Sequence, residues 1–142
     1  MDSELKREIM LDNYTNPFHK ETKDEKEYIK VNGNNVSCID DINLYIKLQN
    51  DIIVDAYFDG EACAISTSST SIMLKNIIGK TKDEVRKYIE NFENMIYEKD
   101  YDESILGEAI VYNEIYKQES RKTCATLPYT ALLKALKKYF DN

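Results

Sequence analysis

The sequence predicts an α+β fold in which a three-stranded antiparallel meander packs against helices. From residue 42 to residue 58, apolar and polar residues alternate in two runs, which is the period of strands with one buried face. Beyond residue 64, apolar residues recur at helical spacing. Strands joined by short turns pair antiparallel. A chain of 142 residues suits one compact domain, so we expect residues 1–142 to form a single domain.

The chain opens with a predicted short helix over residues 3–14, with Ser3 as a possible N-cap. The Asn-Pro pair at 16–17 ends this helix. Residues 28–31 then read as a short strand, and the Asn-Gly-Asn-Asn run at 32–35 reads as a loop.

Two alternating runs predict the remaining strands of the meander. Apolar residues of the first run are Ile42, Leu44, Ile46 and Leu48. After a turn at 49–51, those of the return strand are Ile52, Val54, Ala56 and Phe58. Each run is expected to bury one face.

The rest of the chain is predicted to be mostly helical. A helix over 65–78 ends at Gly79, a natural residue for a helix C-terminus. Thr81 and Glu84 form a capping box for the next helix. The apolar face of that helix comprises Val85, Tyr88, Ile89, Phe92 and Ile96.

Three further segments complete the prediction. Residues 100–107 form a loop or short helix, 109–117 are ambiguous between helix and strand, and 123–140 form the final helix. Pro128 fits that helix only if it lies near the first turn. The expected buried side comprises Leu127, Ala131, Leu132, Ala135, Leu136, Tyr139 and Phe140.

Composition and charge exclude several functional classes. The chain has 19 basic and 26 acidic residues, a net charge of −7, and no dense basic block outside the last helix, which argues against nucleic-acid binding. No window approaches the roughly eighteen apolar residues of a membrane helix. The N-terminus lacks the apolar core of a signal peptide. We therefore expect a cytoplasmic protein without a membrane partner.

The three cysteines are Cys38, Cys63 and Cys124, and each lies at a predicted junction between elements. A reducing cytosol and an odd number of cysteines favour metal binding or thiol chemistry over structural disulfides. Cys63 precedes a Ser- and Thr-rich run that can cap a helix, and a thiol at a helix N-terminus is biased towards thiolate. The only histidine, His19, lies in a polar loop and is interpreted as a surface residue.

Residue types suggest that the cysteines converge on a metal together with Asp40. Cys38, Asp40, Cys63 and Cys124 supply three thiolates and one carboxylate, enough for a closed tetrahedral zinc site. Sulfur ligands select zinc or iron–sulfur species over magnesium or calcium. A carboxylate exchanges more readily than a thiolate, which suits a site that must open. The alternative is equally open at this point: Cys63 is a small buried apolar residue, Cys124 a helix residue, and Asp40 a loop cap.

The same residues resemble the U-type iron–sulfur cluster assembly family, which includes IscU, the N-terminal part of NifU, and SufU. The resemblance covers nearly the whole chain. Its motifs here are Cys38-Ile39-Asp40, Gly60-Glu61-Ala62-Cys63-Ala64-Ile65-Ser66, Cys124-Ala125, Tyr14-Thr15-Asn16-Pro17 and Gly79-Lys80-Thr81. Thr123 stands where IscU-like members carry a histidine, and residues 121–127 are similar to the corresponding run of the SufU branch.

The resemblance implies a SufE/NifU-like fold and a zinc-dependent sulfurtransferase that receives persulfide sulfur from a SufS-like cysteine desulfurase. It implies zinc at Cys38, Asp40, Cys63 and Cys124. It also implies catalytic roles for Cys38 as persulfide acceptor, for Cys124, and for Arg121, which helps the partner engage. Downstream iron–sulfur assembly proteins would receive the sulfur.

Two departures and two alternatives accompany this interpretation. Ile39 and Ala62 replace glycines of the family pattern, and a positive φ at either position would strain the loop. An iron–sulfur scaffold would use the same three cysteines to build a cluster. A non-catalytic partner-binding module could keep the fold without sulfur transfer.

Overall fold

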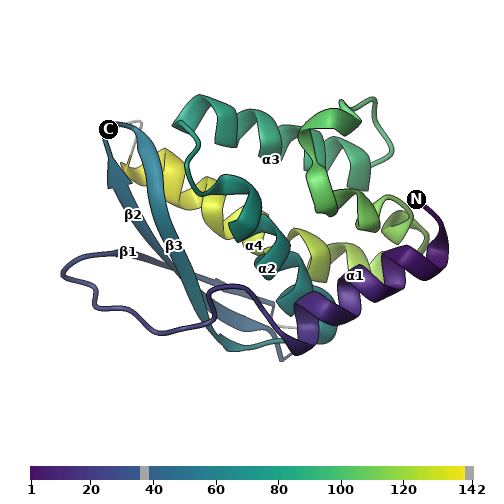
Figure 1. Ribbon diagram of the computed structural model, residues 1–142, viewed down its shortest axis with the longest axis horizontal. Helices are drawn as coiled ribbons and strands as arrows, with labels where there is room; N and C mark the ends of the chain where they lie inside the picture. Colours follow the sequence, from purple (N-terminus) through teal and green to yellow (C-terminus); the bar gives the residue numbers. More distant parts are fainter. Residues whose placement is uncertain (36–38, 140–142) are drawn as a thin grey trace.

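The predicted α+β fold is confirmed by the computed structural model, which describes residues 1–35 and 39–139 (Figure 1). The sheet has the order β1-β2-β3, and both neighbouring pairs are antiparallel. Its strands are β1 (Ile29–Asn34), β2 (Asp41–Gln49) and β3 (Ile52–Glu61).

Strand β1 extends through residues that the sequence predicted as a loop. Gly33 pairs with Ile42 inside the sheet. A Cβ atom at Gly33 would lie only 3.1 Å from the Cβ of Ala131. The glycine therefore serves close packing between the strand and the last helix, and the signal of the Asn-rich run for a turn is overridden.

A β-bulge shifts the alternation within β3. Leu48 pairs with Ile53 whereas Lys47 pairs with Asp55, so Val54 is an extra residue. As a result Ile53 is fully buried and Val54 is 37% exposed. The prediction that Ile52 and Val54 face the core is therefore wrong, while that for Ala56 and Phe58 is confirmed.

The described part of the chain also contains four α-helices and three short 3₁₀ helices. The α-helices are α1 (Ser3–Thr15), α2 (Ala64–Ile77), α3 (Lys82–Ile96) and α4 (Glu119–Tyr139). The 3₁₀ helices η1 (Glu103–Ile105), η2 (Gly107–Tyr112) and η3 (Ile115–Lys117) settle the two ambiguous segments as helical. Asp2, not Ser3, caps α1, because its carboxylate accepts from the N–H of Leu5 at 2.8 Å.

Helix α3 agrees closely with its prediction. The N–H of Glu84 donates to Thr81 Oγ1 at 3.3 Å, and the N–H of Thr81 donates to Glu84 Oε1 at 3.0 Å. All five predicted apolar residues of α3 are buried. Helix α2 ends before Gly79, whose φ of 89° is typical of a glycine after a helix.

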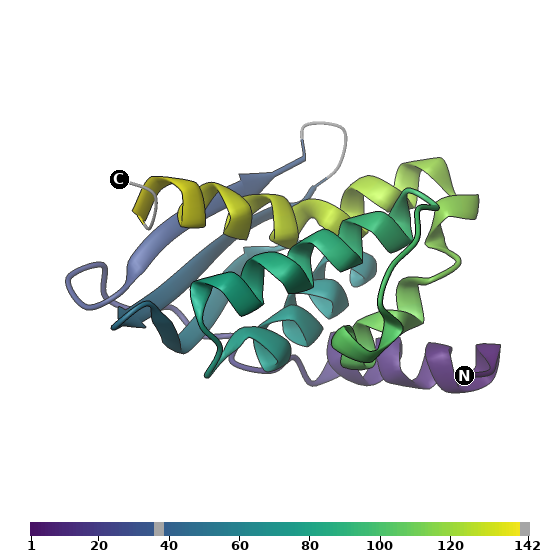
Figure 2. The ribbon, with the colours of Figure 1, turned by 90° about the horizontal axis from the view of Figure 1, so that it is seen from above.

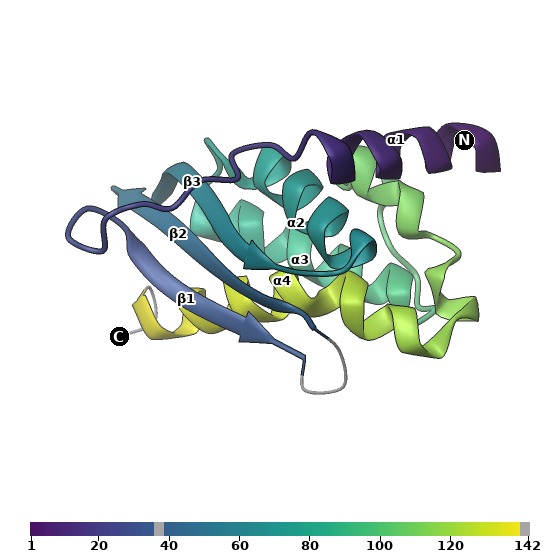
Figure 3. The same cartoon turned by 90° about the horizontal axis from the view of Figure 1, so that it is seen from below.

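Helices α2, α3 and α4 lie on one face of the sheet, in front of it in Figure 2 and behind it in Figure 3. Helix α1 extends beyond the end of the sheet and packs against α2. Helix α4 packs against β1 and β2, and α2 continues from β3 between α1 and α4. The start of α2 is thereby held where the end of the sheet meets α4. No helix in the described part of the chain is both long and apolar enough to span a membrane.

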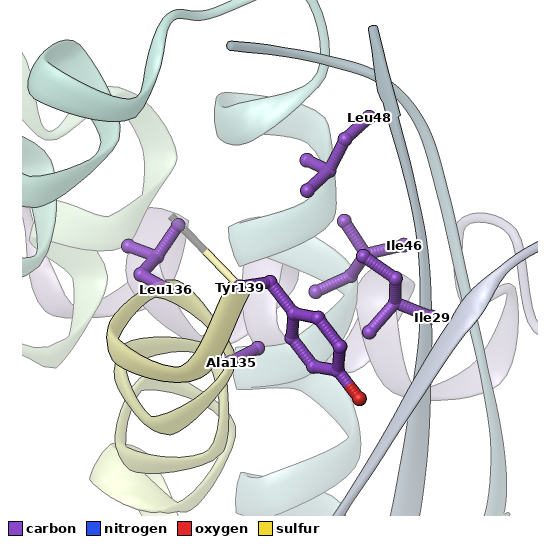
Figure 4. Close-up of a pocket in the computed structure, with 6 residues that line it drawn as sticks. All are labelled: Ile29, Ile46, Leu48, Ala135, Leu136 and Tyr139. Carbon is purple, nitrogen blue, oxygen red and sulfur yellow. The ribbon is translucent and has the colours of Figure 1, made fainter. Parts of the chain in front are cut away.

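Helix α4 begins earlier than expected, at Glu119, so Pro128 lies in its interior and not near its first turn. The predicted buried side of α4 is confirmed from Leu127 to Leu136. Tyr139 is instead 43% exposed. Its ring lies beside Ile29 and Ile46, with the phenol oxygen directed away from them (Figure 4). Phe140 lies outside the described residues.

Replacing Thr81 with Ala tests the capping box. We expect the free energy of unfolding in urea to fall by about 1 kcal/mol, because the N–H of Glu84 loses its acceptor. Thr130→Ala is the control, since Thr130 is exposed in the interior of α4. Equal destabilisation by both substitutions would contradict a capping role.

Candidate metal centre

Asp40, Cys63 and Cys124 come together at the end of the sheet, as their residue types suggested. Their carboxylate oxygen and sulfur atoms all lie within 4.8 Å of one another. Asp40 immediately precedes β2, Cys63 lies between β3 and α2, and Cys124 lies in α4. Cys38, the fourth residue of the predicted set, lies outside the described residues. The described part of the site therefore offers two thiols and one carboxylate.

Gly60 allows the two strand ends that carry Asp40 and Cys63 to approach. Its φ is 109°, which side-chain-bearing residues rarely adopt, and a Cβ there would collide with the carbonyl oxygen of Asp41. Gly60 pairs with Ile42, directly across the sheet. This glycine therefore sets the short distance between the start of β2 and the start of α2.

Asp40 is held as a carboxylate by two strong hydrogen bonds. It is 1% exposed. The N–H of Cys63 donates to its Oδ1 at 2.7 Å, and the hydroxyl of Ser66 lies 2.6 Å from its Oδ2. Burial on its own would raise the pKa of Asp40, but hydrogen bonds from Ser66 and from both cysteines lower it below its usual value. The carboxylate is therefore in the ionised form that binds metals.

Cys63 is the N-cap of α2, which confirms its predicted place at a helix N-terminus. The N–H of Ser66 donates to its Sγ at 3.4 Å. Cys63 is partly exposed as a residue, whereas Cys124 is buried.

Cys124 has a different environment, because it lies inside α4 and not at a junction between elements. Its thiol is buried and donates to the carbonyl of Ser120 at 3.7 Å. Burial is the main cause that raises the pKa of Cys124 to about 12, and the neighbouring Cys63 and Asp40 raise it further. Without a metal this residue is a thiol at neutral pH.

The donor set fits a thiophilic metal. Buried thiolate and carboxylate ligands are those of closed zinc sites, and sulfur disfavours magnesium and calcium. Three donors leave one position of a tetrahedron to be filled. No cofactor other than a metal or a metal–sulfur cluster is suggested by these groups.

The other residues singled out in the sequence lie around or away from this cluster. Arg121 is exposed on α4, one helical turn before Cys124. Ile39 is 70% exposed, and Ala62 is not among the described residues with positive φ, so no strain arises at Ala62. His19 is not in the cluster. It is partly buried, contrary to prediction, between the rings of Phe18 and Tyr57 at 3.8 and 4.3 Å.

Sequence reasoning missed Ser66 as a residue of the site. Its hydroxyl is fully buried and lies within hydrogen-bonding distance of Asp40, of Cys63 and of the backbone of Cys124. The available signal was its position three residues after Cys63, which places both on one face of the first turn of α2. Hydroxyls are common near helix starts, so the spacing alone did not single it out.

Comparison with known proteins places the chain in a family. Residues 5–142 match the model of the NifU-like N-terminal domain. The zinc-dependent sulfurtransferase SufU of Bacillus subtilis is 38% identical over 94% of this chain and 90% of that protein. The scaffold protein IscU of Thermotoga maritima is 38% identical over 75% of each. A crystal structure of a putative SUF-system scaffold protein from Fervidobacterium islandicum superposes with a TM-score of 0.80 at 38% identity, covering 89% of this chain and 92% of that one. The chain therefore belongs to the NifU-like N-terminal domain family.

Proposed function

We propose that this protein acts in iron–sulfur cluster assembly as a zinc-bound sulfurtransferase that accepts persulfide sulfur from a SufS-like cysteine desulfurase. The observation that carries the proposal is the buried cluster of Asp40, Cys63 and Cys124. Similarity to the SufU of Bacillus subtilis over 94% of this chain supports zinc as the metal. We further propose that the protein works in the cytosol and passes sulfur to downstream assembly proteins.

In this proposal Asp40, Cys63 and Cys124 hold the zinc together with Cys38. Zinc would keep the cysteines deprotonated at neutral pH. The hydrogen bonds of Asp40 orient its carboxylate towards the two sulfurs before any metal arrives. Because a carboxylate is exchanged more readily than a thiolate, Asp40 is the ligand suited to loosening when the partner docks.

Sulfur transfer itself is assigned to Cys38. Its thiolate attacks the outer sulfur of the desulfurase persulfide, a new S–S bond forms on Cys38, and the desulfurase cysteine leaves as a thiolate. No oxidant or reductant is consumed, because one S–S bond replaces another. Cys124 supports the reaction as a ligand that stays buried, and Arg121, exposed one turn before it, is proposed to contact the desulfurase.

A second candidate function is an iron–sulfur scaffold, which the 38% identity with the IscU of Thermotoga maritima favours. The same cysteines would then hold a cluster. A third outcome, a partner-binding module without transfer activity, would leave the site without metal. Metal analysis separates the three.

For protein purified without oxygen and without chelator, we expect about one zinc per chain and no acid-labile sulfide, because a closed four-ligand site binds a single ion. Elemental analysis and a sulfide assay measure both. Iron with sulfide would replace the proposal with the scaffold function, and absence of both would favour the partner-binding module.

Replacing Cys38 with Ser tests the acceptor. We expect this variant to lose stimulation of desulfurase turnover, and intact-mass analysis to find no added sulfur atom on the chain, because the nucleophile is gone. Ile39→Gly is the control, since the exposed Ile39 side chain is the immediate neighbour. Full stimulation by Cys38→Ser would contradict the assignment.

Replacing Arg121 with Ala tests partner contact. We expect the affinity for the desulfurase to fall by roughly thirtyfold or more, because truncating one member of a buried interface charge pair costs about 2 kcal/mol or more. Zinc content should stay unchanged, since Arg121 is outside the cluster. Lys117→Ala, at another exposed cation ahead of α4, is the control. Equal losses in the two variants would show only a general charge effect.

A further inference from the structure

Pro128 leaves the carbonyl of Cys124 without its normal donor in α4. In an α-helix the carbonyl of residue 124 accepts from the N–H of residue 128, and proline has no N–H. The hydroxyl of Ser66, from α2, lies within hydrogen-bonding distance of this carbonyl, 3.1 Å from its oxygen. The hydroxyl of Ser69, one turn later on α2, donates to the next carbonyl, that of Ala125, at 2.6 Å.

The Ser66 hydroxyl has more acceptors than protons. It lies 2.6 Å from Oδ2 of Asp40 and 3.1 Å from the carbonyl oxygen of Cys124, but a hydroxyl carries a single proton. The shorter distance and the charge of the carboxylate favour donation to Asp40. The Cys124 carbonyl is therefore a second acceptor within reach of the Ser66 hydroxyl, which donates to Asp40.

We propose that Ser66 is a positioning residue whose hydrogen bond switches from Asp40 to the Cys124 carbonyl when the carboxylate engages the metal, and that Pro128 keeps this second acceptor available. The inference rests on the proposed function only in taking Asp40 as a metal ligand. The hydroxyl has a partner in both states. Ser66 thus competes with the metal for Asp40 without ever becoming a buried unsatisfied donor, which makes the carboxylate an exchangeable ligand.

Replacing Ser66 with Ala removes the competitor of the metal. We expect zinc affinity, measured by competition with a chromogenic chelator, to rise roughly fivefold, because the charge-assisted bond lost without metal is stronger than the neutral bond lost with metal. The metal-free protein should melt at a lower temperature. Ser69→Ala is the matched control. It also removes a buried donor to an α4 carbonyl but touches no proposed ligand, so its zinc affinity should not change.

Replacing Pro128 with Ala should have the opposite effect on zinc. The restored N–H of residue 128 becomes a second donor to the Cys124 carbonyl and weakens the bond that Ser66 can make to it, so the Ser66 hydroxyl favours Asp40 more strongly. We expect zinc affinity to fall roughly fivefold while the metal-free protein gains stability. In the Ser66→Ala background, Pro128→Ala should leave zinc affinity unchanged. If either residue had a purely structural role, the two substitutions would not change zinc affinity in opposite directions. Nor would the effect of Pro128→Ala depend on the presence of Ser66.

Three outcomes would overturn the inference. Weaker zinc binding by Ser66→Ala is the first. The second is a loss of zinc affinity on Pro128→Ala that is as large in the Ser66→Ala background as in the wild-type protein. Either would leave the proposed function intact, because the wild-type protein still binds zinc in that experiment. A wild-type protein that takes up no zinc is the third, and it would overturn both proposals.

Discussion

The site depends on the hydrogen bonding of one buried carboxylate. Asp40 is almost fully buried, and a buried charge is tolerated only when it is well hydrogen-bonded. Its two oxygens are held by the N–H of Cys63, the N-cap of α2, and by Ser66, in the first turn of α2. These bonds tie the start of β2 to the start of α2, and Gly60 is the residue that lets the two approach. The position of Cys63 follows from the same bonds.

Buried hydrogen bonds hold elements together along the whole length of α2, because hydroxyl groups rather than large apolar side chains fill much of its buried surface. Ser69 donates to the Ala125 carbonyl of α4, and Ser68 is hydrogen-bonded to the phenol of Tyr112 at 2.6 Å. Ser71 donates to Asn13 of α1 at 2.7 Å. Small side chains permit close helix packing, and their hydroxyls fix the register between helices. The same helix therefore positions Asp40 and Cys63 and holds together the elements that carry the proposed ligands.

Sequence-based prediction succeeded where an element depends on local patterns and failed where it depends on contacts between distant segments. Helix α3 was predictable because the capping box of Thr81 and its apolar face are local patterns. The bulge at Val54 was not, since it depends on pairing with β2. The beginning of α4 at Glu119 was missed because residues 119–122 carry no apolar pattern. In the site, residue type and position indicated Asp40 and Cys63, whereas the role of Ser66 arises from contacts between distant segments. Cys38 stays a prediction.

Charge also explains why a site rich in thiols contains one carboxylate. Several ionised groups crowded into a buried space repel one another. Burial in the first place, and then the neighbouring Cys63 and Asp40, raise the pKa of Cys124 to about 12, so this sulfur keeps its proton without a metal. Asp40 stays ionised because the hydrogen bonds from Ser66 and from the Cys63 N–H stabilise its negative charge. In the proposed zinc site the two groups would respond differently to the metal: Cys124 would give up a proton, and Asp40 would give up a hydrogen bond. A ligand that exchanges one hydrogen bond for one metal contact needs no proton acceptor, so Asp40 would be the ligand that leaves and returns without a change in protonation.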